Sequence, residues 1–163
     1  MAKKKQVKTN ALRLLEQKKI SHQEQSFEID DTQHLTAGDV AERLGIPAEN
    51  IFKTLVAVGN KTGYLVAVIP SNHELDLKKL AKASGNKKVE MLPLKELETV
   101  TGYIRGGCSP LGMKKQFPTY LHQSAETLEV VYVSAGKRGL QMSLNPQDLK
   151  KVVGAHVADI VQG

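Results

Sequence analysis

Several residue types that commonly build functional sites are scarce in this chain. Tryptophan is absent and aromatic residues make up only 4% of the 163 residues. This composition argues against a row of aromatic rings on which nucleic-acid bases stack. The single cysteine, Cys108, excludes an internal disulfide and a thiolate metal cluster, and it fits a reducing compartment. We therefore expect a cytoplasmic protein.

Long hydrophobic runs and metal-ligand spacings are also missing. No apolar stretch approaches the roughly 18 residues that span a bilayer, and residues 1–5 lack the apolar character of a secretion signal. We therefore expect no membrane partner. The five histidines are scattered without ligand spacing, so the sequence indicates neither a metal site nor a cofactor.

The remaining composition is that of a folded domain. Hydrophobic residues account for 40% of the chain and charged residues for 25%. A domain of this length buries roughly 70% of the surface that its unfolded chain exposes. We predict a single domain over residues 1–163, of which residues 1–8 form a basic, flexible arm.

The positive charge is concentrated near the amino terminus. The net charge is +6, and residues 1–19 carry all of it, because they hold seven basic side chains and one acidic one. The basic ones are Lys3, Lys4, Lys5, Lys8, Arg13, Lys18 and Lys19. Such an arm is typical of a segment that contacts phosphates, and equally of a solvated terminus.

Helical apolar spacing, capping residues and turn signals place the regular elements along the chain. Helices are expected over residues 9–19, from the cap Thr36 to Gly45, over residues 75–84 and 93–100, and from Pro146 onward. Strands are expected over residues 51–58, 64–69, 88–92, 119–122, 128–134, 139–144 and 156–161. This order predicts an α+β fold with a mixed or antiparallel sheet curled around one core.

The loop at residues 106–112, Gly-Gly-Cys-Ser-Pro-Leu-Gly, is the most informative segment. Three glycines let a ligand approach the main chain, a proline fixes one dihedral angle, and Lys114 and Lys115 follow. The composition favours a loop that holds an anion or an oxyanion, and a tight turn between two elements remains the alternative. Ser109 lacks the surroundings of a nucleophile elbow, so we expect a hydrogen-bonding hydroxyl. Cys108 has no identifiable histidine partner, which favours a buried apolar role.

Two further basic positions stand out. Lys53 is the only charged residue in the otherwise apolar or small strand 51–58. Its ammonium either reaches water at the edge of the sheet or points into a cleft. Lys137 and Arg138 lie between Gly136 and Gly139 at an expected hairpin tip, where they would contact phosphate or simply be solvated.

Three motifs in this order resemble the YbaK/EbsC family. They are residues 36–41 leading to Ile-Phe-Lys-Thr-Leu at 51–55, the loop at 106–112, and Val-Ser-Ala-Gly-Lys-Arg-Gly-Leu-Gln at 133–141. Members are free-standing aminoacyl-tRNA deacylases, similar to the editing insertion domain of bacterial prolyl-tRNA synthetases. The resemblance implies a mixed sheet closed into a distorted barrel with flanking helices. Cys108 falls on the variable position of the family loop, which weakens its claim as a nucleophile.

The resemblance also implies a reaction and a site. The expected reaction removes cysteine from mischarged tRNA(Pro), with the cysteinyl thiol attacking its own ester to release a thiolactone. Lys53 is the expected catalytic residue, and the expected substrate-binding residues are Thr54, Gly106, Gly107, Ser109, Pro110 and Gly112. The expected tRNA contacts are Lys3, Lys4, Lys5, Lys114, Lys115, Lys137 and Arg138. Main-chain amides near Gly106 and Gly107 would hold the oxyanion, each contributing about 3 kcal/mol.

Other interpretations stay open at this stage. A deacylase for alanine or another small amino acid belongs to the same class. A non-catalytic tRNA-binding module is a second possibility, against which Lys53 and the intact loop argue. A small phosphate-binding protein would leave the basic amino-terminal helix without a purpose. Prolyl-tRNA synthetase is the expected partner. A missing methylene changes binding in an apolar pocket by only about 1–3 kcal/mol, so this synthetase cannot fully reject cysteine or alanine by binding alone and needs a separate editing step.

Overall fold

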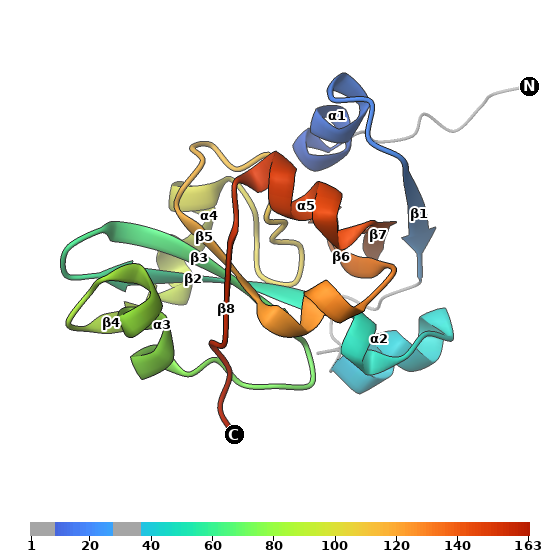
Figure 1. The fold of residues 1–163 in the computed structure, drawn as a ribbon. Coiled ribbons are helices and arrows are strands. Elements are labelled where there is room, and N and C mark those ends of the chain that lie inside the picture. The colour runs from blue at the N-terminus through green and yellow to red at the C-terminus, as the bar shows by residue number, and fades with distance from the viewer. Residues whose placement is uncertain (1–8, 28–36) are drawn as a thin grey trace, which may run out of the picture.

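The computed structural model describes residues 9–27 and 37–163, whose strands form two sheets (Figure 1). The smaller sheet is antiparallel and has the order β1 (His22–Ser26), β7 (Leu140–Leu144), β6 (Val131–Lys137). The larger sheet has the order β4 (Val89–Met91), β2 (Phe52–Gly59), β3 (Gly63–Pro70), β5 (Thr119–His122), β8 (His156–Ala158). Its β4–β2–β3 part is antiparallel, whereas β5 and β8 add in parallel.

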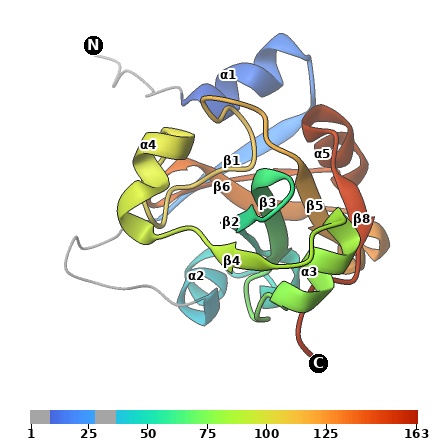
Figure 2. The ribbon, with the colours of Figure 1, turned by 90° about the vertical axis from the view of Figure 1, so that its left-hand side faces the viewer.

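Five α-helices and three 3₁₀ turns connect and flank these strands (Figure 2). The helices are α1 (Asn10–Gln17), α2 (Ala37–Leu44), α3 (Leu77–Ser84), α4 (Leu97–Thr101) and α5 (Pro146–Val153) among the described residues. The 3₁₀ turns are η1 (Ala48–Asn50), η2 (Leu94–Glu96) and η3 (Gln123–Thr127). Thr9, Asp76 and Asn145 cap α1, α3 and α5 with side-chain oxygens that accept main-chain N–H bonds. The predicted cap Thr36 lies outside the described residues.

The predicted α+β mixture with a mixed sheet is confirmed, but the described strands do not close into a barrel. A single parallel bridge between Ile51 and Tyr132 joins the two sheets. β4 pairs with only the last three residues of β2. The sheet therefore stays open beside the first half of β2.

Two hydrophobic cores lie on either side of the β2–β3 hairpin. Phe52 and Val56 face the larger core, which is shared with the smaller sheet, α1 and α5. Ala57 and Leu65 face the second core, which α3 and β8 cover. Because neighbouring side chains of a strand point to opposite faces, Lys53 and Thr54 of β2 are presented to different sides.

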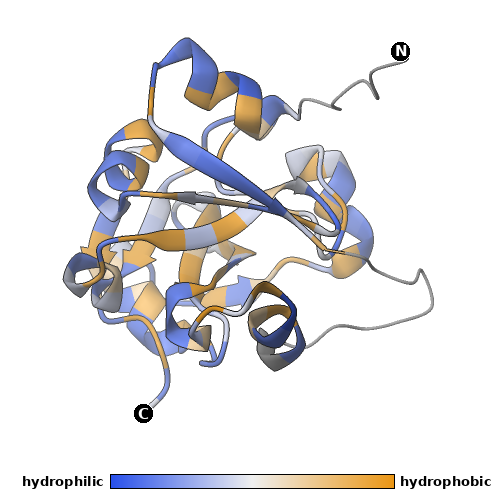
Figure 3. Cartoon of the chain, turned by 90° about the vertical axis from the view of Figure 1, so that its right-hand side faces the viewer, coloured by the Kyte–Doolittle hydropathy of each residue, from blue (hydrophilic) through white to orange (hydrophobic). Residues whose placement is uncertain are grey.

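Strand β1 was not predicted from the sequence. Its residues, His-Gln-Glu-Gln-Ser, are all hydrophilic and lack the apolar alternation that identifies a strand (Figure 3). Main-chain pairing with β7 holds it at the edge of the smaller sheet. None of the helices in the described ranges combines the length and the apolar character that crossing a bilayer requires.

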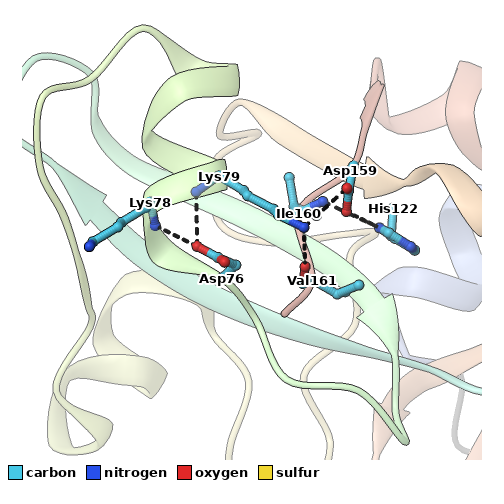
Figure 4. Close-up of polar contacts among 7 residues, drawn as sticks. All are labelled: Asp76, Lys78, Lys79, His122, Asp159, Ile160 and Val161. Carbon is cyan, nitrogen blue, oxygen red and sulfur yellow. Dashed lines mark hydrogen bonds and ion pairs between the residues drawn. The ribbon is translucent and has the colours of Figure 1, made fainter. Parts of the chain in front are cut away.

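A polar cluster ties the carboxyl-terminal segment to α3 and β5 (Figure 4). Lys79 Nζ donates to Asp159 Oδ2 at 3.1 Å and to the carbonyl oxygen of Val161 at 2.9 Å. Ile160 N donates to His122 Nδ1 at 3.3 Å. Burial lowers the pKa of His122 below its usual 6.5, although the nearby carboxylate of Asp159 acts in the opposite direction. His122 is thus held neutral, as the acceptor of a main-chain bond.

Candidate active site

A cavity of about 830 Å³ opens beside the first half of β2, where the three sequence motifs meet. Its walls are formed by Phe27, Val40, Ile51, Phe52, Lys53, Thr54, Leu55, Val56, Ser71, Met91, Leu92, Leu94, Leu97, Ile104, Arg105, Gly106, Cys108, Ser134, Arg138, Gly139 and Gln141. Most of these residues come from β2, the β4–α4 segment, the glycine loop and the β6–β7 hairpin, whereas Phe27 follows β1, Val40 lies in α2 and Ser71 follows β3. Segments far apart in the sequence therefore share one site.

Lys53 borders this cavity. Its side chain is 31% exposed, and its ammonium lies 4.0 Å from a carboxylate oxygen of Glu74, which is itself 79% exposed. Exposed pairs of this kind contribute little, typically about 0–1 kcal/mol. The ammonium can consequently exchange Glu74 for an anionic or polar ligand in the cavity.

The main chain of β2 is open at the same place. Leu92 N donates to the carbonyl oxygen of Val56 at 3.0 Å, which is the last contact of β2 with the β4 side. In an antiparallel ladder the hydrogen-bonding direction alternates, so the N–H and C=O of Thr54 point to the same side as those of Val56. No strand of the described residues pairs there, and the Thr54 amide faces the free edge of the sheet.

Three buried side-chain oxygens in the cavity wall have no hydrogen-bond partner among the described residues. They are Thr54 Oγ1, Ser71 Oγ and Gln141 Oε1. An unsatisfied buried polar group is unfavourable by about 1–3 kcal/mol, and such groups concentrate where a ligand supplies the missing bond. The three residues line the cavity, but these oxygens themselves lie within the packed wall and are shielded from water.

The glycine loop packs against the tip of the β6–β7 hairpin. A Cβ added at Gly107 would lie 3.0 Å from Arg138 N and 3.1 Å from the carbonyl carbon of Lys137. Gly106 has a φ of +82° and lies against the side chain of Arg138. A Cβ at either position would crowd these neighbours, so glycine favours the close approach that brings the second and third motifs into contact.

The rest of the loop lies behind the cavity wall. Ser109 is fully buried, and its Oγ accepts the N–H of Leu111 at 3.3 Å, as a turn residue does. A Cβ at Gly112, where φ is +74°, would lie 2.7 Å from the carbonyl carbon of Asn10 in α1. Of the predicted substrate-binding residues, Thr54 and Gly106 border the cavity with Lys53. The wall does not include Gly107, Ser109, Pro110 and Gly112.

The main-chain amide of Gly107 is also occupied, since its N–H donates to the carbonyl oxygen of Ile104 at 3.0 Å. The expectation that this amide holds an oxyanion therefore does not agree with the structure. The sequence showed the glycines but not the turn that engages the N–H. Lys53, the Thr54 amide and Arg105 are donors that the cavity wall still offers.

Burial decides the chemistry of two residues in this region. It raises the pKa of Cys108 to about 11, although a hydrogen bond with Thr101 acts in the opposite direction. Burial also raises the pKa of Tyr103 to about 12, and its hydroxyl donates to the carbonyl oxygen of Leu111 at 2.6 Å. Cys108 is therefore a protonated thiol at neutral pH, and Tyr103 fastens the end of the glycine loop.

The predicted tRNA-binding residues differ in how exposed they are. Lys114, Lys115 and Lys137 are exposed, and Arg138 is half-buried in the cavity wall. Lys3, Lys4 and Lys5 lie outside the described residues. No group of three or more His, Cys, Asp or Glu in residues 9–27 and 37–163 is placed to hold a metal ion.

Sequence reasoning assigned no site role to four polar members of the wall, one of which is Ser134 of β6. Ser71 follows β3 and Gln141 lies in β7, at positions where the sequence alone gives no sign of an open hydrogen bond. Arg105 immediately precedes the glycine loop, and its charge beside that loop was a usable signal. With Lys53 and Arg138, it makes every charged side chain in the described wall cationic.

Comparison with known proteins identifies the class to which this site belongs. Residues 32–152 match the aminoacyl-tRNA editing domain family. The chain belongs to this family, which confirms the resemblance found in the sequence.

The chain is also similar to individual proteins of known assignment. EbsC of Enterococcus faecalis, assigned as a Cys-tRNA(Pro)/Cys-tRNA(Cys) deacylase, is 62% identical over 161 residues, which cover 98% of each chain. A proline–tRNA ligase of Trichlorobacter lovleyi is 28% identical over 102 residues, or 63% of this chain and 18% of the ligase. A crystal structure of a protein assigned as a trans-editing enzyme for prolyl-tRNA synthetase has a TM-score of 0.81 at 26% identity and covers 97% of this chain.

Proposed function

We propose that this protein is an aminoacyl-tRNA deacylase that acts in trans and removes cysteine from tRNA(Pro). The observation that carries the proposal is the convergence of Lys53, the Thr54 amide at the free strand edge, and Gly106 on one cavity, in a chain of the editing family. The 62% identity with the Enterococcus protein supports cysteine as the amino acid. Deacylation of alanine is the alternative within the same class.

The proposed reaction requires few catalytic groups from the protein, because an aminoacyl ester is already activated. The cysteinyl sulfur attacks the ester carbonyl, a carbon–sulfur bond forms, and the carbon–oxygen bond to the ribose breaks. The thiol proton passes to the departing ribose hydroxyl, so a thiolactone and free tRNA result. The Lys53 ammonium and the Thr54 N–H are the groups that would stabilise the oxyanion during this step.

The proposed setting follows from the same family. We expect the enzyme to act in the cytoplasm on free aminoacyl-tRNA, with prolyl-tRNA synthetase as its candidate partner. The exposed lysines Lys114, Lys115 and Lys137 would contact tRNA phosphates, as would the arm that carries Lys3, Lys4 and Lys5. These contacts position the RNA without reading its sequence.

The test uses the purified full chain and tRNA(Pro) charged separately with cysteine, alanine and proline. We expect loss of the cysteinyl ester, with the prolyl ester left intact. Lys53→Ala should reduce the rate by about a hundredfold or more, as removal of one oxyanion donor does. Lys61→Ala, an exposed lysine of the β2–β3 turn, is the matched control and should leave the rate unchanged. Survival of all three esters would contradict the assignment.

A further inference from the structure

A second groove, of about 510 Å³, lies between the end of α1 and α5. The two helices lie side by side in Figures 1 and 2, and apolar side chains of both, such as Leu15 and Leu149, are buried in the same core. The groove is lined by Lys18, Lys19, Ile20, Ser21, Asp148, Lys151 and Val152. None of these residues borders the cavity beside β2, so the groove is a separate site.

The groove carries positive charge that the described residues do not neutralise. Its three lysines, Lys18, Lys19 and Lys151, are all exposed, and no carboxylate of the described residues forms an ion pair with any of them. Lys150, which precedes Lys151 on α5, differs in this respect because its ammonium lies 3.2 Å from a carboxylate oxygen of Glu126. The three ammonium groups of the groove are therefore available to an anionic ligand.

The backbone of Lys19 indicates a role for its side chain beyond folding. Its φ is +56°, and it is the only described residue other than glycine with a positive φ. Helices α3, α4 and α5 end with Gly85, Gly102 and Gly154 in the same left-handed conformation, which glycine adopts without strain. A lysine at this position is less favourable than a glycine, and strain of this kind is typical of residues that bind a ligand.

Helix α1 connects the groove to the glycine loop. Gly112 of that loop packs against Asn10 at the start of α1, and the groove lies at the other end of the helix. The eight residues of α1 rise roughly 12 Å, at about 1.5 Å each. A macromolecule with one end in the cavity can therefore contact the groove with another part.

The lining favours a nucleic-acid backbone over a protein surface. Protein interfaces have apolar and often aromatic centres, whereas the apolar lining residues here are Ile20 and Val152, both half-buried against the core. Lysine and hydroxyl side chains such as Ser21 are the groups that contact phosphate and sugar. Asp148, the one acidic lining residue, lies in the first turn of α5, where its charge complements the helix dipole.

We propose, resting on the proposed function, that the groove between α1 and α5 binds the sugar–phosphate backbone of the tRNA body through Lys18, Lys19 and Lys151. These contacts hold the RNA at a distance from the ester and do not read its bases. They contribute to the binding of tRNA and not to the reaction, because the groove lies outside the cavity.

The binding test uses uncharged tRNA(Pro) and the full chain, so it needs no deacylase activity. The triple variant Lys18→Gln/Lys19→Gln/Lys151→Gln should bind about tenfold more weakly or worse at about 0.1 M salt. The logarithmic salt slope should also decrease by about 2, because each lost phosphate contact removes about 0.7–0.9. Lys150→Gln alters the adjacent lysine, which pairs with Glu126, and is the matched control that should keep the wild-type affinity and slope.

The single variant Lys19→Gly separates binding from folding. Glycine suits the positive φ, so the melting temperature should stay the same or rise, whereas the affinity for tRNA should fall by about fivefold. With Cys-tRNA(Pro) as substrate, KM should rise in the same proportion and kcat should not change, because the reacting groups remain in place.

Wild-type affinity and salt slope in the triple variant would overturn the proposal, and so would an equal loss of affinity in Lys150→Gln, which would reflect net charge alone. A lower melting temperature in Lys19→Gly would assign that lysine to the fold and not to RNA. If the triple variant keeps its affinity for tRNA but loses binding to polyglutamate, the groove binds an acidic protein segment instead. If the wild type cleaves no ester yet the triple variant still loses affinity for tRNA, the proposed function fails and the groove stands.

Discussion

The thiol of Cys108 borders the cavity but lacks the ionisation that a nucleophile requires. Its pKa of about 11 keeps it protonated at neutral pH, because burial disfavours the thiolate. We predict that Cys108→Ser retains most of the deacylase activity, since the reacting sulfur belongs to the substrate. A serine at this position also keeps the hydrogen-bonding capacity toward Thr101. The measurement is kcat/KM for Cys-tRNA(Pro), with Lys53→Ala as the inactive reference.

An opposite result would change the mechanism. A loss of about a hundredfold in Cys108→Ser, with an unchanged melting temperature, would show that the enzyme thiol takes part in the reaction. The deacylase would then proceed through an acyl-enzyme, and rapid mixing would reveal a burst of free tRNA.

At the level of single residues, the sequence indicated which residue types belong to the site but not how they pack against one another. Lys53 was recognisable because a lone cation in an apolar strand requires an explanation, and it does border the cavity. The glycine loop was recognisable too, but its glycines act by close packing against Lys137, Arg138 and α1. Those neighbours are distant in the sequence, so the packing was not predictable from the loop alone. The unsatisfied oxygens of Ser71 and Gln141 depend on tertiary contacts in the same way.

Among the elements, those with local signals were predicted well. The capped helices α3 and α5 and the β2–β3 hairpin correspond to their expected ranges within a few residues. The expected helix at residues 93–100 is divided into η2 and α4, and the last strand is shorter than expected. The division into two sheets was not predicted, because β3–β5 and β1–β7 pairing joins segments that are far apart.

The β2–β3 hairpin depends on one buried amide. Asn86 Oδ1 accepts the N–H groups of Lys61 (2.8 Å) and Thr62 (3.1 Å), and its Nδ2 donates to Ser84 Oγ at 2.7 Å. We predict that Asn86→Ala lowers the free energy of unfolding by about 2–3 kcal/mol, because it removes a buried side chain that both accepts from two turn amides and donates to Ser84. Urea unfolding followed by circular dichroism measures the change.

A neighbouring amide provides the control. Asn60 Oδ1 also accepts two main-chain N–H groups, those of Lys87 and Lys88 at 2.9 Å each, but it is exposed. Water can replace the missing acceptor, so Asn60→Ala should lower the free energy of unfolding by less than about 1 kcal/mol. Equal losses in the two variants would show that burial of Asn86 contributes nothing.

At the scale of the whole molecule, the uneven charge predicts how tRNA is held. Residues 1–19 carry a charge of +6, equal to the net charge of the chain. We predict that deleting residues 1–5 weakens tRNA binding and flattens its dependence on salt, by about 0.7–0.9 in the logarithmic slope for each phosphate that the arm neutralises. Affinity measured at several salt concentrations tests this, with catalysis by the shortened chain at low salt as the check on folding. An unchanged slope would mean that the arm does not contact RNA.

The pH dependence of stability should follow from the cluster that holds the carboxyl-terminal segment. The pKa of His122 is lowered in the folded protein by burial, and the charges of His73 and Lys79 add to this effect. The carboxylate of Asp159 opposes it but has a lowered pKa of its own, chiefly through its hydrogen bond with Lys79. Asp159 therefore stays charged in the range where a histidine titrates.

The sign of the effect follows from proton binding. Between the folded pKa of His122 and its unfolded value of 6.5, the unfolded chain binds more protons, so the free energy of unfolding decreases as the pH falls. Protonation also abolishes the acceptor that Nδ1 offers to Ile160 N. We predict a loss of stability as the pH falls below about 6.5, and we expect His122→Gln to reduce this loss, because glutamine keeps an acceptor and does not titrate. Urea unfolding across this range measures it. His156→Gln, which alters an exposed histidine of β8, should retain the wild-type slope; equal slopes in His122→Gln and the wild type would assign the effect to other groups.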